Sequence, residues 1–327
     1  MKKRILAMLL SALLVGNIGG CSYVTGNDID MNTEKTETTQ DKVPDEGKNN
    51  LNKPVDINDL MFVSNGNGTC YINGFQKDNY QDILVTLSIP ASSPNGEIVT
   101  GIGKSAFWQC TNITSVEMSD SVTYIGNFAF TFCDQLKTIR FSNQLLVIGR
   151  EAFFGCEQLE NIELPQKLTK IGDSAFSFCH MLESVTIQEH VTSIGKGIFS
   201  FSENLCNITV DKNNSTFYSL NNCIIDKESK SVIAGCKNSV IPQDDNVICI
   251  SSKAFCFDFS SFTIPNNIKR IEQAAIDNGF SYLYTIVYNG TIEEWETLIL
   301  NNPHLDVWKY EVTVHCTDGI KASLSKG

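Results

Sequence analysis

An Ile-Gly pair recurs at a fixed interval through the middle of this 327-residue chain. The five pairs begin 23 residues apart, at Ile102, Ile125, Ile148, Ile171 and Ile194. Each Ile is followed after five residues by a Phe and after eight by a Cys, except that Ser202 replaces the fifth Cys. A unit of this size cannot bury its own apolar face, so successive units must stack on one another. The period predicts a β-rich solenoid, a class that presents extended surfaces.

Each unit divides into two parts. The first part has apolar residues spaced L-x-x-L-x-L, as in Leu136, Ile139 and Phe141, and this spacing predicts short parallel strands on one face. Alternate residues of such a strand point into the core and the others point outward. The second part returns the chain along the other side, where Phe176 should fill the interior and Gly172 should relieve the backbone at the turn.

These residues carry a family resemblance. The motif I-G-x-x-A-F-x-x-C-x-x-L-x-x-I-x-I/L-P, most complete from Ile148 to Pro165, resembles the BspA-type leucine-rich repeat of bacterial surface proteins. Asn222–Asp226 followed by Ala234–Asn238 is similar to the hairpin insertion of that family. Tyr288–Trp295 and Val314–Gly319 are similar to its terminal segment. The resemblance implies a leucine-rich repeat array and a role in adhesion.

The N-terminus has the pattern of a bacterial export signal. Lys2, Lys3 and Arg4 precede a mainly apolar run that ends at Ile18, and this run is too short to span a bilayer unaided, which takes about 20 residues. The following Gly19-Gly20-Cys21 resembles a lipobox, which implies cleavage before Cys21 and a lipid on that residue. We therefore expect a lipoprotein signal peptide over 1–20 and a lipid-anchored protein at the bacterial cell surface, with no other membrane contact.

The remaining chain divides by composition and phase. Residues 21–56 comprise Cys21 and a polar stretch too poor in apolar groups to order itself, and we expect a disordered tether there. An N-terminal cap and incomplete leading repeat should occupy 57–100, and the regular leucine-rich repeats 101–210. The period is lost over 211–249, where we expect an irregular hairpin insertion. Degenerate repeats and a C-terminal cap should follow over 250–320, with a capping box at Thr291 and Glu294 that opens a short helix.

Charge and motifs exclude several functions. Removal of the signal peptide lowers Lys plus Arg from 25 to 22 against 37 acidic residues, which leaves a net charge of −15 and disfavours nucleic acid. No motif of nucleophilic, metal-dependent or phosphate-loop catalysis is present, and the four His are scattered. We therefore expect no enzymatic activity and no cofactor.

The cysteines are the one conspicuous group with chemistry. The repeat thiols lack a C-x-x-C pair, so they are expected to be buried space-fillers in a ladder and not metal ligands. Cys223 and Cys236 flank a hairpin that should turn over 227–230, and a disulfide between them is a hypothesis. Five aromatic residues also lie in the returning segments, where burial is expected: Trp108, Phe132, Phe154, Phe178 and Phe201.

The outward strand positions form a mostly small and polar lattice with two residues per repeat. They are Ser115, Glu117, Thr138, Arg140, Asn161, Glu163, Ser184, Thr186, Asn207 and Thr209. Such a lattice suits an extended extracellular protein or glycan, where many weak contacts add up. The sequence thus favours adhesion to host matrix or to other cells. The alternative is a structural or assembly component of the envelope that recruits other exported proteins.

Overall fold

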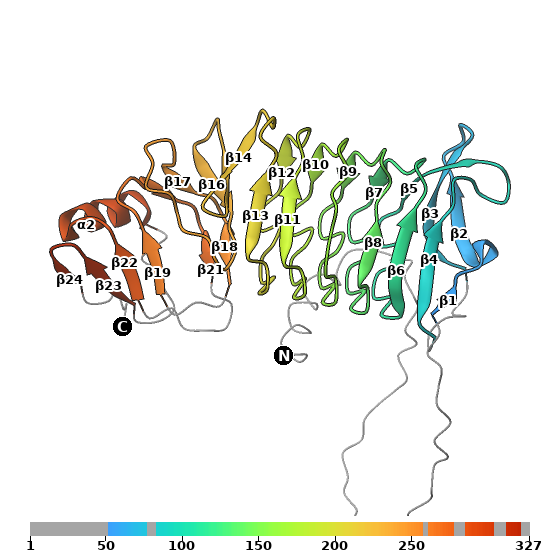
Figure 1. Ribbon diagram of the computed structural model, residues 1–327, viewed down its shortest axis with the longest axis horizontal. Helices are drawn as coiled ribbons and strands as arrows, with labels where there is room; N and C mark the ends of the chain where they lie inside the picture. Colours follow the sequence, from blue (N-terminus) through green and yellow to red (C-terminus); the bar gives the residue numbers. More distant parts are fainter. Residues whose placement is uncertain (1–51, 77–82, 258–260, 278–284, 304–311, 322–327) are drawn as a thin grey trace, which may run out of the picture.

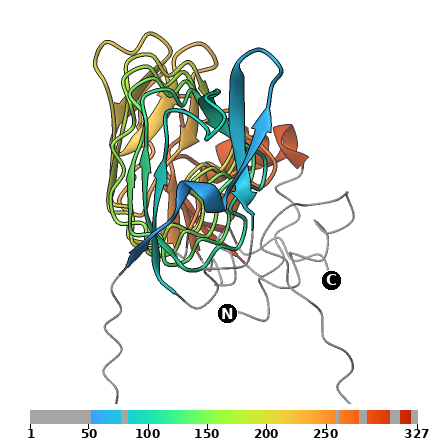
Figure 2. The ribbon, with the colours of Figure 1, turned by 90° about the vertical axis from the view of Figure 1, so that its right-hand side faces the viewer.

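The computed structural model describes residues 52–76, 83–257, 261–277, 285–303 and 312–321. They form a leucine-rich repeat fold of many short strands, with a single α-helix in this described part. The strands succeed one another along the long axis of an elongated molecule (Figure 1), and the end-on view shows the coils superimposed around a common interior (Figure 2). Cys21 and most of the expected tether lie outside the described residues.

One long side of the coil carries parallel strands with an exposed outer surface. A first sheet has the order β1 (Lys53–Pro54), β4 (Val85–Ile89), β6 (Ile113–Met118) and β8 (Thr138–Arg140), and β11 (Ser184–Ile187) pairs with β13 (Asn207–Val210) further along. Thr138 aligns with Ser115 on one side and forms an isolated parallel bridge to Asn161 on the other. Corresponding residues of successive repeats therefore lie side by side. We call the outward side of these strands the strand face.

A second sheet runs along the coil where the Ile-Gly pairs lie. Its order is β12 (Ser193–Ile194), β10 (Lys170–Ile171), β9 (Val147–Ile148), β7 (Tyr124–Ile125), β5 (Ile98–Ile102), β3 (Thr69–Phe75) and β2 (Leu60–Ser64). The five Ile residues of the repeat are directly aligned neighbours in this sheet. At its N-terminal end, β2 pairs antiparallel with β3, and the 3-10 helix η1 (Ile57–Asp59) precedes this hairpin.

Antiparallel pairing interrupts the array after β13. Strands β14 (Phe217–Leu220), β15 (Cys223–Asp226) and β16 (Ser231–Ala234) form a meander. Because Asp226 pairs with Ser231, the turn between β15 and β16 lies at 227–230, as expected. Parallel pairing then resumes from β16 to β17 (Cys249–Ile250) and β20 (Arg270–Ile271). The short strands β18 (Phe255–Cys256) and β21 (Ile276–Asp277) also pair in parallel.

The C-terminal end combines a sheet with the helix. The sheet has the order β19 (Ser261–Ile264), β22 (Thr285–Tyr288), β23 (Thr313–Cys316) and β24 (Gly319–Lys321). Helix α2 spans Ile292–Asn301 and begins with the predicted capping box. The Thr291 hydroxyl accepts from the Glu294 amide at 3.2 Å, and the Glu294 carboxylate accepts from the Thr291 amide at 2.8 Å. Trp295 and Leu298 are buried, so the helix covers apolar surface at this end.

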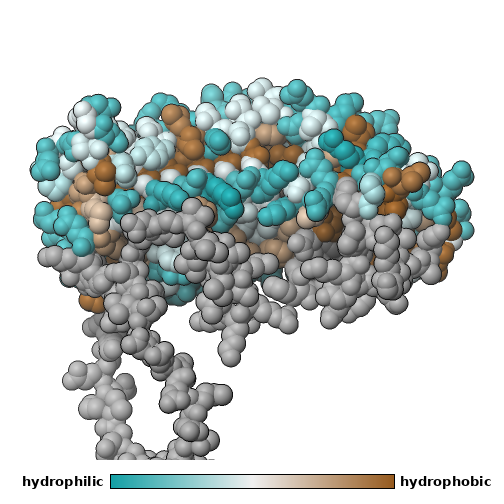
Figure 3. Space-filling model, turned by 180° about the vertical axis from the view of Figure 1, so that it is seen from behind, coloured by the Kyte–Doolittle hydropathy of each residue, from teal (hydrophilic) through white to brown (hydrophobic). Residues whose placement is uncertain are grey.

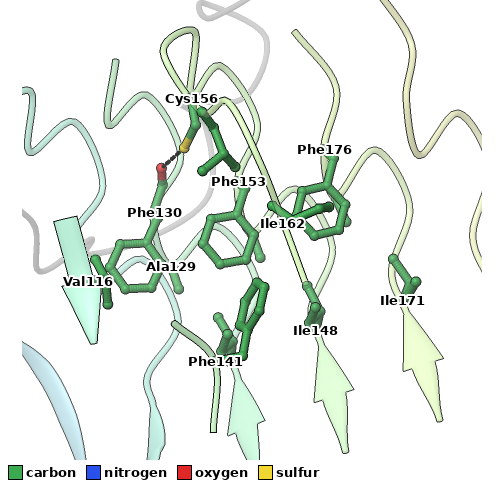
Figure 4. Packing of buried hydrophobic residues seen from close by; sticks show 14 of the residues in the cluster. Val116, Ala129, Phe130, Phe141, Ile148, Phe153, Cys156, Ile162, Ile171 and Phe176 are labelled. Atoms are coloured by element: carbon green, nitrogen blue, oxygen red, sulfur yellow. Dashed lines mark hydrogen bonds between the residues drawn. The ribbon is translucent and has the colours of Figure 1, made fainter. Parts of the chain in front are cut away.

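The interior of the coil is a ladder of phenylalanines. Phe107, Phe130, Phe153, Phe176 and Phe199 have exposures of 0–1%. Successive rings are stacked, with centroids 5.3 Å apart from Phe130 to Phe153 and from Phe153 to Phe176 (Figure 4). The prediction that these residues fill the interior once per repeat is confirmed by their burial.

Glycine is required in each repeat for a different reason from the one expected. Gly172 is not among the residues with a left-handed backbone. A Cβ built at Gly172 would lie 2.4 Å from the Arg150 amide nitrogen, and one at Gly195 would lie 2.3 Å from the Asp173 amide nitrogen. The expectation that Gly172 relieves strain at a turn is therefore wrong. Glycine is required because the backbone of the preceding repeat passes too close for any side chain.

We predict that Gly172→Ala lowers the free energy of unfolding by about 2–3 kcal/mol. The new Cβ would collide with backbone atoms of Gly149 and Arg150, which cannot rotate away as a side chain could. Chemical denaturation followed by circular dichroism measures the loss. Gly66→Ala is the matched control, since its Cβ would meet nothing within 4 Å although its φ is +76°. That control should lose only about 1 kcal/mol from the left-handed backbone. Equal losses in the two variants would show that close approach is not the reason for Gly172.

Candidate functional site

The strand face exposes the residues that the repeat pattern places outward. Nine of the ten are exposed to solvent, and Ser115 is half-buried. The apolar residues between them are buried, as at Val116 (2%) and Val185 (3%), except that Ile139 is half-buried. The alternation of inward and outward side chains therefore holds from β6 to β13. It leaves two parallel rows of mostly small polar side chains along the molecule.

Few strong interactions tie this surface up. Glu117 and Arg140 form an ion pair on neighbouring strands, and each side chain is 61% exposed. The hydroxyls of Thr186 and Thr209 lie 2.9 Å apart. An exposed ion pair contributes little to stability, typically less than about 1 kcal/mol. Its two charges can therefore be re-paired by a partner at small cost.

The repeat cysteines point inward and act as hydrogen-bond donors. The Cys133, Cys156 and Cys179 thiols donate to the carbonyl oxygens of Phe107, Phe130 and Phe153 at 3.1, 3.2 and 3.3 Å. Ser202 donates to the Phe176 carbonyl at 2.8 Å in the same way (Figure 4 shows the Cys156 bond). The sequence indicated only a space-filling role. The exchange of Cys for Ser in the fifth copy was the available signal for a donor.

Burial suppresses the reactivity of these thiols. Desolvation raises the pKa of Cys156 and Cys179 well above the usual thiol range, and it raises the pKa of Cys223 to about 12. A protonated thiol is a poor nucleophile and a poor metal ligand. Among the described residues, no group of three His, Cys, Asp or Glu side chains is placed to hold a metal ion.

The hypothetical disulfide between Cys223 and Cys236 is not formed. Both residues are free thiols in the structure. The Cys223 thiol lies 3.7 Å from the carbonyl oxygens of Asn221 and Val240, and the Ser239 hydroxyl lies 3.6 Å from the Cys236 sulfur. The hairpin is instead closed by backbone pairing between β15 and β16.

The repeat region matches a known protein family. Six copies of the BspA type leucine rich repeat region match residues 100–225 and 221–306, which is more than half of the chain. The chain belongs to the BspA-type leucine-rich repeat family. Proteins of this family are generally surface-associated and protein-binding, and the family is not generally enzymatic.

Solved structures of bacterial leucine-rich repeat proteins are similar to this chain. A leucine-rich repeat protein from Eubacterium ventriosum is 21% identical, with 71% of this chain and 77% of that chain covered and a TM-score of 0.50. A leucine rich cell surface protein from Faecalibacterium prausnitzii is 19% identical over 73% and 96%, with a TM-score of 0.40. The pneumococcal vaccine antigen PcpA is 21% identical over 71% and 62%, with a TM-score of 0.47. No curated protein matches the sequence.

The BspA-type repeats also place aromatic side chains on the side of the coil away from the strand face. The five expected to be buried are only half-buried: Trp108, Phe132, Phe154, Phe178 and Phe201. Four of them form a continuous row, with ring centroids 5.4 Å apart from Phe132 to Phe154, 5.0 Å from Phe154 to Phe178 and 4.8 Å from Phe178 to Phe201. Figure 3 shows a hydrophobic band along this side of the molecule.

The histidines do not assemble into a site. His180 is half-buried against Phe178, with ring centroids 6.0 Å apart, whereas His190 and His315 are exposed on other parts of the described chain. His304 lies outside the described residues. No described helix is long and apolar enough to cross a membrane.

Proposed function

We propose that the protein is a bacterial cell-surface binding protein whose strand face engages an extended extracellular protein or glycan. Each 23-residue repeat supplies one rung of a solenoid, and one pair of outward side chains on each rung contributes to binding. Cys21 carries the lipid, and the tether up to residue 56 holds the folded part away from the membrane. Adhesion to host matrix or to other cells is the role that this arrangement serves.

The exposure of the outward strand rows carries the proposal. The rows are flat, polar and open over several consecutive repeats, and Glu117, Arg140 and Glu163 give them charges of both signs. No single contact on such a surface is strong, but aligned contacts on a rigid array add up because the array is already ordered before binding. Membership of a family that is generally surface-associated and protein-binding supports the same role.

We predict that replacing Glu117, Arg140 and Glu163 together with Ala weakens partner binding by about tenfold. The three side chains are exposed, so the variant should unfold like the parent protein. Affinity capture from host and bacterial surface extracts identifies the partner, and surface plasmon resonance then measures the dissociation constants.

The matched control replaces Glu228, Lys269 and Glu293 with Ala. These three residues are also exposed and change the net charge equally, but they lie outside the strand face. The control should bind like the parent. If the strand-face variant retains full binding, the assignment of this face is wrong. Capture of envelope assembly proteins alone would favour the structural role over adhesion.

A further inference from the structure

The side of the coil opposite the strand face has charged residues along two borders. We define the rear face as the segments 104–111, 127–134, 150–157, 173–180 and 196–203, which cross the molecule between the Ile-Gly pair and the next strand. Backbone hydrogen bonds join them side by side, as from the Phe107 amide to the Ala129 carbonyl at 2.8 Å and from the Phe153 amide to the Ala175 carbonyl at 2.9 Å. The segments therefore form a parallel lattice with fixed spacing.

The middle of the rear face is apolar. The row from Phe132 to Phe201 follows the long axis, and these rings are half-buried and in contact with one another. Trp108 occupies the preceding repeat and is also half-buried. Aromatic side chains bury large areas and anchor protein interfaces. A row of them that is open to solvent favours a partner surface.

The two borders of the rear face carry no like charges in the same segment, and in the third and fifth segments their charges are opposite. The first residues of the five segments are Lys104, Asn127, Arg150, Asp173 and Lys196, and all five are exposed. The last residues, in the same order, are Thr111, Asp134, Glu157, His180 and Glu203. The first border is basic in the first, third and fifth segments, neutral at Asn127 and acidic at Asp173. The last border is acidic in the second, third and fifth segments, neutral at Thr111 and occupied by His180 in the fourth.

This pattern is complementary to itself. We propose that the rear face binds a second copy of this chain, about a two-fold axis parallel to the long axis of the molecule. This operation places the first border of one copy against the last border of the other, with the repeats in the same order. Arg150 then faces Glu157 of the partner subunit, Lys196 faces Glu203 of the partner subunit, and Asp173 faces His180 of the partner subunit.

The charges also select this axis over the other face-to-face arrangement. A two-fold axis across the molecule would reverse the order of the repeats and set the first borders against each other. Arg150 would then face a second Arg150, which is unfavourable. The selected axis keeps both β1 strands at the same end of the dimer, and it brings the two aromatic rows together at the centre of the interface. Apolar burial at the centre with charges at the rim is the usual arrangement of protein interfaces.

The contacts that the border residues make within one chain leave them able to contact a second copy. Arg150 contacts Glu151 at 2.8 Å, but its side chain is 59% exposed. Lys196 lies 3.9 Å from Glu272 and is 63% exposed. Exposed pairs of this kind are weak, so the same cations can be shared with a facing carboxylate.

Sedimentation velocity of the full chain over a dilution series tests the proposal. The parent chain should dimerise reversibly, and Arg150→Glu should raise the dimer dissociation constant at least about tenfold, because two symmetric contacts become repulsive. The double variant Arg150→Glu, Glu157→Arg should recover most of the affinity, since the pairs are restored with the charges exchanged. Recovery of this kind cannot result from misfolding.

The matched control is Arg140→Glu on the strand face. Arg140 is 61% exposed and paired with a glutamate, as Arg150 is, and its replacement should leave the dimer unchanged. A parent chain that stays monomeric at all concentrations overturns the proposal. So does a dimer that Arg150→Glu leaves intact, because it must then use another face. Either result leaves the proposed role of the strand face standing, since that role is read from partner binding.

Discussion

Replacing Phe153 with Ala should lower the free energy of unfolding by about 3–5 kcal/mol. Phe153 is fully buried, and its ring centroid lies 5.3 Å from those of both Phe130 and Phe176. Phe141 meets the same ring edge-on at 5.8 Å. The variant therefore removes contacts with two neighbouring repeats and with the strand side of its own coil.

The cavity left by Phe153→Ala should persist. Collapse would require the neighbouring coils to move closer, but backbone hydrogen bonds fix their separation, as from the Phe130 amide to the Ala152 carbonyl at 2.8 Å. A cavity that cannot collapse gives losses at the upper end of the usual range. Urea denaturation followed by circular dichroism measures the effect.

The adjacent residue supplies the control. Phe154→Ala removes the same side chain from the half-buried row on the rear face, where solvent can occupy the space, and should cost about 1 kcal/mol. Similar losses in the two variants would mean that the interior ladder does not dominate the packing of the coil.

These two neighbouring residues show what the sequence could and could not predict. The position of Phe153 follows from the period, because one large apolar residue per repeat must fill the interior. The exposure of Phe154 does not follow, because Phe132, Phe178 and Phe201 occupy the next position in their own repeats. In this repeat Gly155 stands at the position that Phe132, Phe178 and Phe201 occupy in theirs, and a Cβ on Gly155 would lie 2.6 Å from the Phe132 ring. Only the packed lattice shows that these four rings form one row.

The outward strand residues were predictable for a simpler reason. Side chains alternate along a strand, so the period fixed which residues point outward before any contact was known. The reason for Gly172 was not predictable, because close approach between neighbouring coils cannot be distinguished from turn geometry in one sequence. The thiol donors and the complementary borders of the rear face required knowledge of which atoms and segments lie opposite one another.

Raising the pH above 9 should destabilise the protein steeply. The buried thiols of Cys156, Cys179 and Cys223 have raised pKa values in the folded chain because burial disfavours the thiolate. In the unfolded chain they should ionise near the ordinary thiol pKa of about 8.5. Below that pH both states hold the protons, and stability does not depend on these groups. Above it the unfolded chain binds fewer protons than the folded chain, so the free energy of unfolding falls as the pH rises.

The size of the effect follows from the number of thiols. Each fully protonated buried thiol contributes a slope of about 1.4 kcal/mol per pH unit, so the three together contribute about 4 kcal/mol per unit. The free energy of unfolding, measured by urea denaturation between pH 8 and pH 11 under reducing conditions, should show this decline. The contribution of Cys223 to this decline ends near its folded pKa of about 12, because above that pH the thiol is ionised in both states.

The double variant Cys156→Ser, Cys179→Ser separates the thiols from every other alkaline group. Serine keeps the donor to the Phe130 and Phe153 carbonyls, as Ser202 does for Phe176, but it does not ionise in this range. The variant should therefore lose the part of the slope that these two thiols contribute, about 3 kcal/mol per pH unit. Tyr288, whose pKa burial also raises, contributes equally to both proteins and cancels in the comparison. An unchanged slope would mean that the repeat thiols are accessible to water in the folded chain, contrary to their place inside the coil.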